Sequence, residues 1–215
     1  MPGNAVNDGR RGGRPTREEA TRLGHAARDA ALRLFLDNGY EATSMDAIAS
    51  EAGTTKATLY ARFGSKEAIF RSVLEWATAR DDWPEPEPEL PDPGDLEGAL
   101  REIARMAVRR GTHPAMVSLM RIAAAEAERF PDLARQAYAA PPWPRRHVVA
   151  DLLERHAAGG AIVLPADARV LAELFLGMVC TPALLATFGA GRDPGAQEEH
   201  TEAAVRLFLR GLRPG

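Results

Sequence analysis

A short polar stretch around residue 56 offers the clearest chemistry in the sequence. Residues 54–60 read Thr-Thr-Lys-Ala-Thr-Leu-Tyr, so hydroxyl, ammonium and methyl groups lie close together. Such groups suit base-pair edges, because a lysine can reach a guanine or a phosphate and small methyl groups can contact the thymine methyl. The sequence contains no phosphate loop, nucleophile elbow, zinc-ligand spacing or His-Glu-x-x-His motif. The stretch therefore favours recognition of double-stranded DNA over catalysis, with simple packing between two short helices as the alternative.

Two short helices are predicted to position this stretch. Ser44 caps a helix that runs to about residue 52, and Gly53 ends it at a position that tolerates positive φ. Thr55 caps the next helix, over about residues 56–63, and Gly64 ends that one. This arrangement is typical of a helix-turn-helix, in which the second helix enters the major groove while the first crosses the backbone.

A longer set of motifs extends this pattern on both sides. The set comprises Gly39-Tyr40, Thr43, Ile48-Ala49, Ala52-Gly53, Thr58-Leu59-Tyr60, Phe63 and Ser65-Lys66-Glu67. With these motifs in register, residues 17–76 closely resemble the DNA-binding domain of the TetR family of transcriptional regulators. A second stretch, residues 124–133, is similar to the ligand-binding domain of part of that family.

The resemblance implies a set of DNA contacts. Lys56 would reach a base or a phosphate, and Tyr60 and Lys66 would bind phosphates. The alternatives are packing against the first helix for Tyr60, a solvated surface position for Lys66 and a plain helix cap for Ser44. An arginine of the N-terminal arm would enter the minor groove, unless the arm only adds salt-dependent affinity. The predicted DNA-contacting residues are Arg14, Thr43, Ser44, Thr54, Thr55, Lys56, Ala57, Thr58, Tyr60, Arg62 and Lys66.

The sequence predicts an all-α fold with two domains. Alanine, leucine, arginine and glutamate dominate, and no alternating apolar and polar run indicates a sheet. We expect a disordered basic arm over 1–15, a three-helix DNA-binding domain over 16–64 and a helical regulatory domain over 65–215. The first helix is predicted over 16–38 and a connecting helix over 65–80, followed by a Pro- and Glu-rich loop over 83–94. Further helices are predicted at about 95–110, 114–130, 131–139, 144–158, 166–188 and 195–212.

The distribution of charge and the composition agree with DNA binding by the N-terminal part of the chain. Residues 1–80 carry a net charge of +2, whereas residues 81–215 carry −5. The single cysteine, Cys180, excludes an intramolecular disulfide and argues against a metal cluster, so no metal or cofactor is expected. The most apolar segment, 170–188, contains Glu173, Gly177 and Pro182, which fits a buried helix better than a membrane span. We therefore expect a cytoplasmic protein with no membrane partner.

A protein that recognises two half-sites of a DNA operator must hold two recognition helices about 34–36 Å apart. This requirement predicts a homodimer. Two apolar stripes near the C-terminus are the predicted interface, because the resemblance implies that the last two long helices pair with those of a partner. The alternative is that the stripes only close the core of one chain. The predicted interface residues are Leu171, Leu174, Phe175, Met178, Ala204, Leu207 and Phe208.

The second domain is expected to bind a small apolar ligand that releases the protein from its operator. Methionine and aromatic side chains suit a site that accepts varied apolar molecules, although they also occur as plain core. The predicted pocket residues are Trp76, Met106, Met116, Met120, His113, Trp143 and Phe175. The sequence thus predicts a ligand-responsive repressor that binds an inverted-repeat operator. The alternatives are a DNA-binding regulator controlled by a protein partner or by no ligand, and an enzyme.

Overall fold

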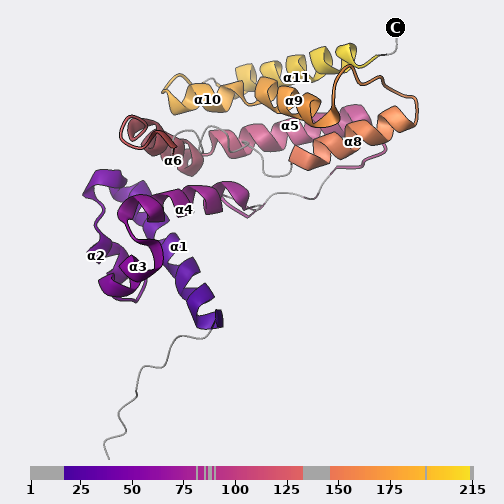
Figure 1. The fold of residues 1–215 in the computed structure, drawn as a ribbon. Coiled ribbons are helices and arrows are strands. Elements are labelled where there is room, and N and C mark those ends of the chain that lie inside the picture. Colours follow the sequence, from indigo (N-terminus) through magenta and orange to yellow (C-terminus); the bar gives the residue numbers. More distant parts are fainter. Residues whose placement is uncertain are drawn as a thin grey trace, which may run out of the picture.

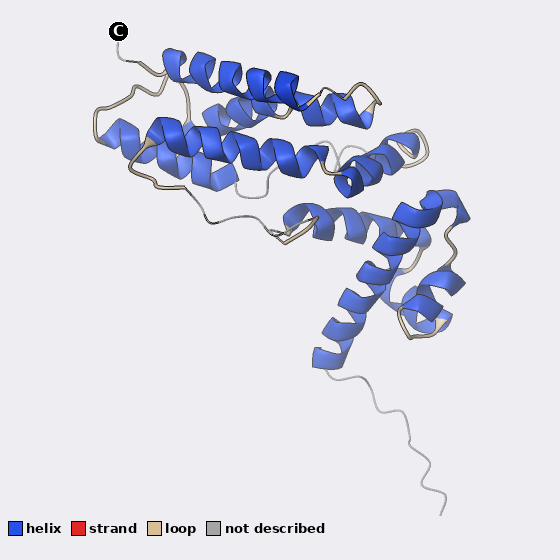
Figure 2. Ribbon diagram, turned by 180° about the vertical axis from the view of Figure 1, so that it is seen from behind, coloured by secondary structure: helices blue, strands red, loops and turns tan. Residues whose placement is uncertain are grey.

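The structure is a computed structural model, and it describes residues 17–80, 82–84, 86, 89, 91–132, 146–191 and 193–213. All regular elements in these residues are helices, which confirms the all-α fold class (Figures 1 and 2). The predicted basic arm, residues 1–15, lies outside the described part of the chain, and so does most of the helix predicted at 131–139.

Four helices build the N-terminal unit: α1 (Arg17–Ala42), α2 (Met45–Glu51), α3 (Lys56–Phe63) and α4 (Lys66–Ala79). Ser44, Thr55 and Ser65 cap the last three, each by accepting a hydrogen bond from the backbone N–H three residues on. Gly53 adopts a φ of 64° in the turn between α2 and α3, a value that side chains with a Cβ rarely allow. The helix-turn-helix therefore follows from local sequence signals.

The core of this unit is formed mainly by α1 and α4. The rings of Phe35 and Phe70 meet edge to face at 5.0 Å between centroids, and Tyr40 lies 5.3 Å from Phe70. Leu119 and Ala123, from a helix much later in the chain, complete the same core. The two halves of the molecule therefore share apolar packing.

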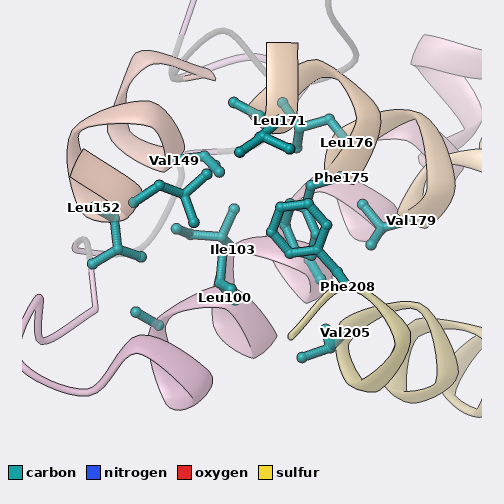
Figure 3. Packing of buried hydrophobic residues seen from close by; sticks show 14 of the residues in the cluster. Leu100, Ile103, Val149, Leu152, Leu171, Phe175, Leu176, Val179, Val205 and Phe208 are labelled. Carbon is teal, nitrogen blue, oxygen red and sulfur yellow. The ribbon is translucent and has the colours of Figure 1, made fainter. Parts of the chain in front are cut away.

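The described residues of the C-terminal unit contain six helices: α5 (Leu96–Thr112), α6 (Pro114–Ala125), α8 (Arg146–Ala158), α9 (Ala168–Val179), α10 (Thr181–Thr187) and α11 (Pro194–Gly211). Their core packs Leu100 and Ile103 of α5 against Val149 of α8, Phe175 of α9 and Phe208 of α11 (Figure 3). The rings of Phe175 and Phe208 lie 4.9 Å apart. In both ribbon views this unit lies above α4, and α11 is at the edge farthest from α2 and α3 (Figures 1 and 2).

Several helix boundaries differ from the predicted ones. The first helix is assigned through Ala42, with non-helical dihedrals at Gly39 (φ 80°, ψ 172°) where an end was predicted. Helix α6 ends at Ala125 instead of residue 130, because residues 126–129 form turns. The helix predicted over 166–188 is two helices, α9 and α10, that meet at Cys180. Pro182 lies in the first turn of α10, where its missing N–H costs nothing.

Gly111 does not end α5, which continues to Thr112. A Cβ at Gly111 would lie 2.6 Å from the Cβ of Ala183, so this glycine lets α10 approach α5 closely. Among the described residues, no single helix has both the length and the apolar character needed to cross a membrane. Helices α9 and α10 meet that requirement only when taken together, and they are bent by 52° at their junction.

Candidate nucleic-acid interface

Helix α3 is anchored by one apolar side chain and exposes most of the others. Leu59 is fully buried in the core shared with α1 and α4. Lys56, Ala57 and Tyr60 are exposed, and 46% of the Tyr60 surface is accessible. The described unit therefore presents small, polar and cationic groups on a helix, and a major groove is wide enough to admit one helix.

The hydroxyl groups at the two helix starts are already engaged. Ser44 Oγ accepts a hydrogen bond from the Ala47 N–H at 3.1 Å. Thr55 Oγ1 accepts one from the Thr58 N–H at 3.2 Å and lies 2.8 Å from Thr58 Oγ1. These bonds hold the side chains at the ends of α2 and α3, where unpaired backbone N–H groups attract phosphate. Thr54, in the turn, is half-buried.

Lys56 pairs with an acidic residue on α2. Its Nζ donates to Asp46 Oδ2 at 2.7 Å, and both side chains are at least half exposed. This hydrogen bond raises the pKa of Lys56 above its ordinary value. Lys56 must therefore exchange Asp46 for DNA when it contacts a base or a phosphate, a competition that the sequence analysis did not foresee.

Thr43 and Lys66 both make contacts within the protein, and their predicted phosphate contacts stay predictions. Thr43 is only 2% exposed, and its hydroxyl lies 2.8 Å from the Gly39 carbonyl. Lys66 Nζ donates to the carbonyls of Tyr40 at 2.9 Å, Glu41 at 3.3 Å and Thr43 at 3.0 Å. The same ammonium lies 4.3 Å from the centre of the Tyr40 ring. Lys66 thus ties the end of α1 and the residue before the α2 cap to the start of α4.

Arg62 lies at the end of α3, against the N-terminal half of α1. A Cβ added at Gly24 would lie 2.3 Å from the Arg62 guanidinium, so the glycine makes room for this side chain. The guanidinium also lies 5.7 Å from the centre of the Phe63 ring. Arg62 is exposed and stays a candidate for a phosphate contact. Arg14 lies outside the described residues.

The predicted dimer residues divide into two groups. Leu171, Phe175, Ala204 and Phe208 are at most 8% exposed and belong to the core of the C-terminal unit, so they are corrected to core residues. Met178 is half-buried against that core. Leu174 and Leu207 are 58% and 64% exposed. The prediction missed other exposed apolar side chains nearby: Val170, Leu184 and Phe188.

The predicted pocket residues that the structure describes are divided between the two cores and the surrounding helices. Met106 and Phe175 are buried in the core of the C-terminal unit, whereas Trp76 and Met120 pack against the core of the N-terminal unit. His113 caps α6 through Nδ1, which accepts the Ala115 N–H at 3.2 Å. Of the other two predicted pocket residues, Met116 is buried and Trp143 lies outside the described residues.

One buried arginine that the sequence analysis missed links the two units. Arg110 of α5 is 5% exposed and donates to the carbonyls of Ala77 and Thr78, in the last turn of α4, at 3.1 and 3.2 Å. A cation at a helix C-terminus is favoured by the helix dipole. No local signal distinguishes this arginine from its neighbour Arg109, because its partner helix lies 32 residues away in sequence.

A short second helix with a polar exposed face, set on a buttressing helix and joined to a larger helical unit, is the arrangement found in DNA-binding proteins of the helix-turn-helix class. Residues 27–73 match the family described as "Bacterial regulatory proteins, tetR family". Residues 98–212 match the "AefR-like transcriptional repressor, C-terminal domain". The chain belongs to the TetR family of transcriptional regulators, as the resemblance predicted, and it is a DNA-binding regulator rather than an enzyme.

Individual relatives agree with this assignment. The chain is 48% identical over 50 residues to the transcriptional repressor ComR of Escherichia coli, covering 23% of this chain and 24% of ComR. It is 36% identical over 90 residues to the regulator AcrR of Shigella flexneri, covering 42% of each. These matches therefore span less than half of either curated relative. The solved structure of the flavonoid-responsive regulator FrrA is 37% identical, with a TM-score of 0.69 over 90% of this chain and 98% of that one.

Proposed function

We propose that this regulator is a homodimeric repressor that binds an inverted-repeat operator and leaves it when a small apolar ligand binds the C-terminal unit. The observation that carries the proposal is the exposed surface of α3, where Lys56, Ala57 and Tyr60 project from a helix fixed by the buried Leu59. Repression is supported by the repressor-type C-terminal match and by ComR. A regulator of this kind acts where the chromosome is, so a cytoplasmic location is part of the proposal.

An exposed apolar face supports the homodimer. Val170 and Leu174 of α9 are one helical turn apart, and Leu184 of α10 is four residues before Phe188, which caps the end of that helix. Leu207 of α11 is also exposed, and α9 packs against both α10 and α11. Five large apolar side chains on three neighbouring helices are more than scattered surface residues, and a second copy would remove them from water.

The ligand class is proposed from the FrrA likeness. FrrA is flavonoid-responsive, and the likeness extends over nearly the whole of both chains. A planar aromatic molecule of this type is largely apolar with a few hydroxyl groups, which fits a domain whose buried surface is almost entirely aliphatic and aromatic. The ligand must bind the DNA-free state more tightly than the DNA-bound state in order to release the operator.

The first test is selection of the purified protein on a random duplex library at near-physiological salt. We expect enrichment of an inverted repeat with half-sites about one helical turn apart. The Lys56→Ala and Thr58→Ala variants should change the enriched bases, whereas Arg109→Gln, an exposed change on α5, should not. An unenriched library with weak, salt-sensitive binding would contradict the specific repressor.

The second test adds a panel of flavonoids to the operator complex and follows its dissociation. Release by flavonoids, but not by matched polar molecules such as sugars, supports the ligand class. Retention of the operator with every panel member would leave specific DNA binding intact. That outcome would contradict the flavonoid class, and control would then belong to another apolar molecule, to a protein partner or to no ligand.

A further inference from the structure

The charged residues of α11 differ between the two sides of the helix. On the side that faces α5, the Glu202 carboxylate lies 2.9 Å from the Arg101 guanidinium and 3.2 Å from that of Arg105. On the outer side, Arg206 is exposed and makes no hydrogen bond or ion pair with a described residue. It directly precedes Leu207, which is 64% exposed on the apolar face of the proposed dimer. Helix α11 therefore keeps an unpaired cation at the edge of that face.

Helix α9 repeats this arrangement with the opposite charge. It lies beside α11 in both ribbon views and packs against it (Figures 1 and 2). Glu173 is exposed and directly precedes the exposed Leu174, and it is the one acidic residue within α9. Its carboxylate also makes no hydrogen bond or ion pair with a described residue. Each of two neighbouring helices thus presents a leucine next to an unpaired charge, and the two charges have opposite signs.

A glycine on the same face indicates what covers it. Gly177, about one turn after Leu174, is exposed inside α9, and a Cβ added there would meet no atom within 4 Å. Glycine destabilises a helix interior relative to alanine, and no neighbour in the described part of the chain requires it at this position. The distance between two packed helices depends on the side chains at their contact. Gly177 therefore suits the close approach of a helix from a second copy of this chain.

Two copies related by a two-fold axis can pair these helices in two ways. If α9 lies on α9 of the partner subunit and α11 on α11, each charge comes near a charge of the same sign. If α9 lies on α11, Glu173 comes near Arg206 of the partner subunit, and the contact occurs twice because such an interface is isologous. Like charges that face each other across an interface strongly oppose association. The charges therefore favour the pairing of α9 with α11.

We propose that Glu173 and Arg206 form reciprocal ion pairs between the two subunits, and that these pairs select a second copy of this chain as the partner. The apolar side chains favour association with any surface of similar shape and polarity. Charges at the edge of an apolar face exclude partners whose charges do not match. The inference rests on the proposed homodimer and adds the residues that decide which chains pair.

The first experiment measures the dissociation constant of the full-length dimer by sedimentation equilibrium. Glu173→Arg and Arg206→Glu each turn two attractive pairs into two repulsive ones, so we expect each to weaken dimerisation about tenfold or more. The double variant restores both pairs with exchanged signs and should recover most of that loss. The controls are Glu154→Arg on α8 and Arg109→Glu on α5, which reverse exposed charges on other helices and should leave the dissociation constant unchanged.

The second experiment mixes differently tagged proteins and follows subunit exchange by native mass spectrometry. Glu173→Arg and Arg206→Glu should pair with each other in preference to themselves, because both ion pairs are then attractive. Formation of this heterodimer also shows that both variants fold. The double variant should remain separate from the unmodified chain, because both contacts between them are repulsive.

The outcomes distinguish the ion pairs from the dimer itself. Unchanged dissociation constants in both single variants would overturn the inference. Free mixing of the double variant with the unmodified chain would also refute it, because the charges would then not select the partner. If the unmodified protein is a monomer at every concentration tested, the proposed homodimer fails, whatever the charges do.

Discussion

The role of Lys66 can be tested by replacing it with methionine, which keeps the length and apolar stem of the side chain. The replacement removes three hydrogen bonds of 2.9–3.3 Å to carbonyls at the end of α1 and in the following segment. It also removes the ammonium 4.3 Å from the Tyr40 ring. A hydrogen bond from a charged donor contributes about 1.5–3 kcal/mol, and an exposed cation–π contact about 0.5–1 kcal/mol.

Because Lys66 is only half-buried, water replaces part of what is lost. We therefore expect Lys66→Met to lower the free energy of unfolding by about 2 kcal/mol, which corresponds to a drop in Tm of about 4–8 °C. Lys66→Arg should recover only part of the loss, since a planar guanidinium cannot direct its donors at three converging carbonyls as an ammonium does. Thermal unfolding followed by circular dichroism measures both changes.

The second assay is the salt dependence of operator binding. A lysine that neutralises one phosphate contributes about 0.9 to the slope of log K against log salt. We expect Lys66→Met to weaken operator binding with an unchanged slope, because α2 loses its support while no phosphate contact is lost. Lys56→Met, at the other lysine of the chain, should weaken binding at unchanged Tm. A slope reduced by about one in Lys66→Met, together with an unchanged Tm, would refute the positioning role.

Three further substitutions and one labelling experiment test other parts of the structure. Asp46→Asn should raise operator affinity several-fold, because it removes the internal competitor of a DNA-contacting lysine; equal or lower affinity in a binding titration would contradict this. Leu207→Glu should convert the dimer to a monomer in sedimentation, whereas the exposed Arg109→Gln should not. Burial raises the pKa of Cys180 to about 12, so alkylation at pH 8 should be negligible in the native protein and appear on unfolding; rapid native labelling would count against it. Gly111→Ala should cost about 1–3 kcal/mol, because the new methyl group meets Ala183 at 2.6 Å, and denaturant titration measures that cost.

The helix-turn-helix could be predicted because its determinants are local. Ser44, Thr55 and Ser65 each cap a helix by bonding a backbone N–H three residues away. Gly53 and Gly64 adopt φ values of 64° and 83°, which glycine tolerates best. Each signal is complete within a few residues of sequence, so the starts of α2, α3 and α4 and the ends of α2 and α3 follow without knowledge of the rest of the chain.

The orientation of the apolar helices could not be predicted in the same way. Helix α9 is apolar on most of its surface, so its sequence does not show that Phe175 faces inward while the adjacent Leu174 faces outward. That choice is made by Phe208 of α11, which packs on Phe175. The dimer prediction consequently found the correct helices for an exposed face but assigned several residues of the core to it.

The roles of the charged residues depended most strongly on distant parts of the chain. Lys66 appears in the sequence as a lysine at the start of a helix, where a phosphate contact is a reasonable prediction. Within the protein, its ammonium donates to carbonyls 23 to 26 residues earlier. Arg110 and Arg121 likewise bind helix ends 32 to 66 residues away. These three cations occupy junctions at α1, α4 and α10, where helix ends leave carbonyls without partners. In this regulator, then, positive charge connects the helices that carry the DNA-binding unit as well as facing DNA, and a count of basic residues overstates the charge available for phosphate.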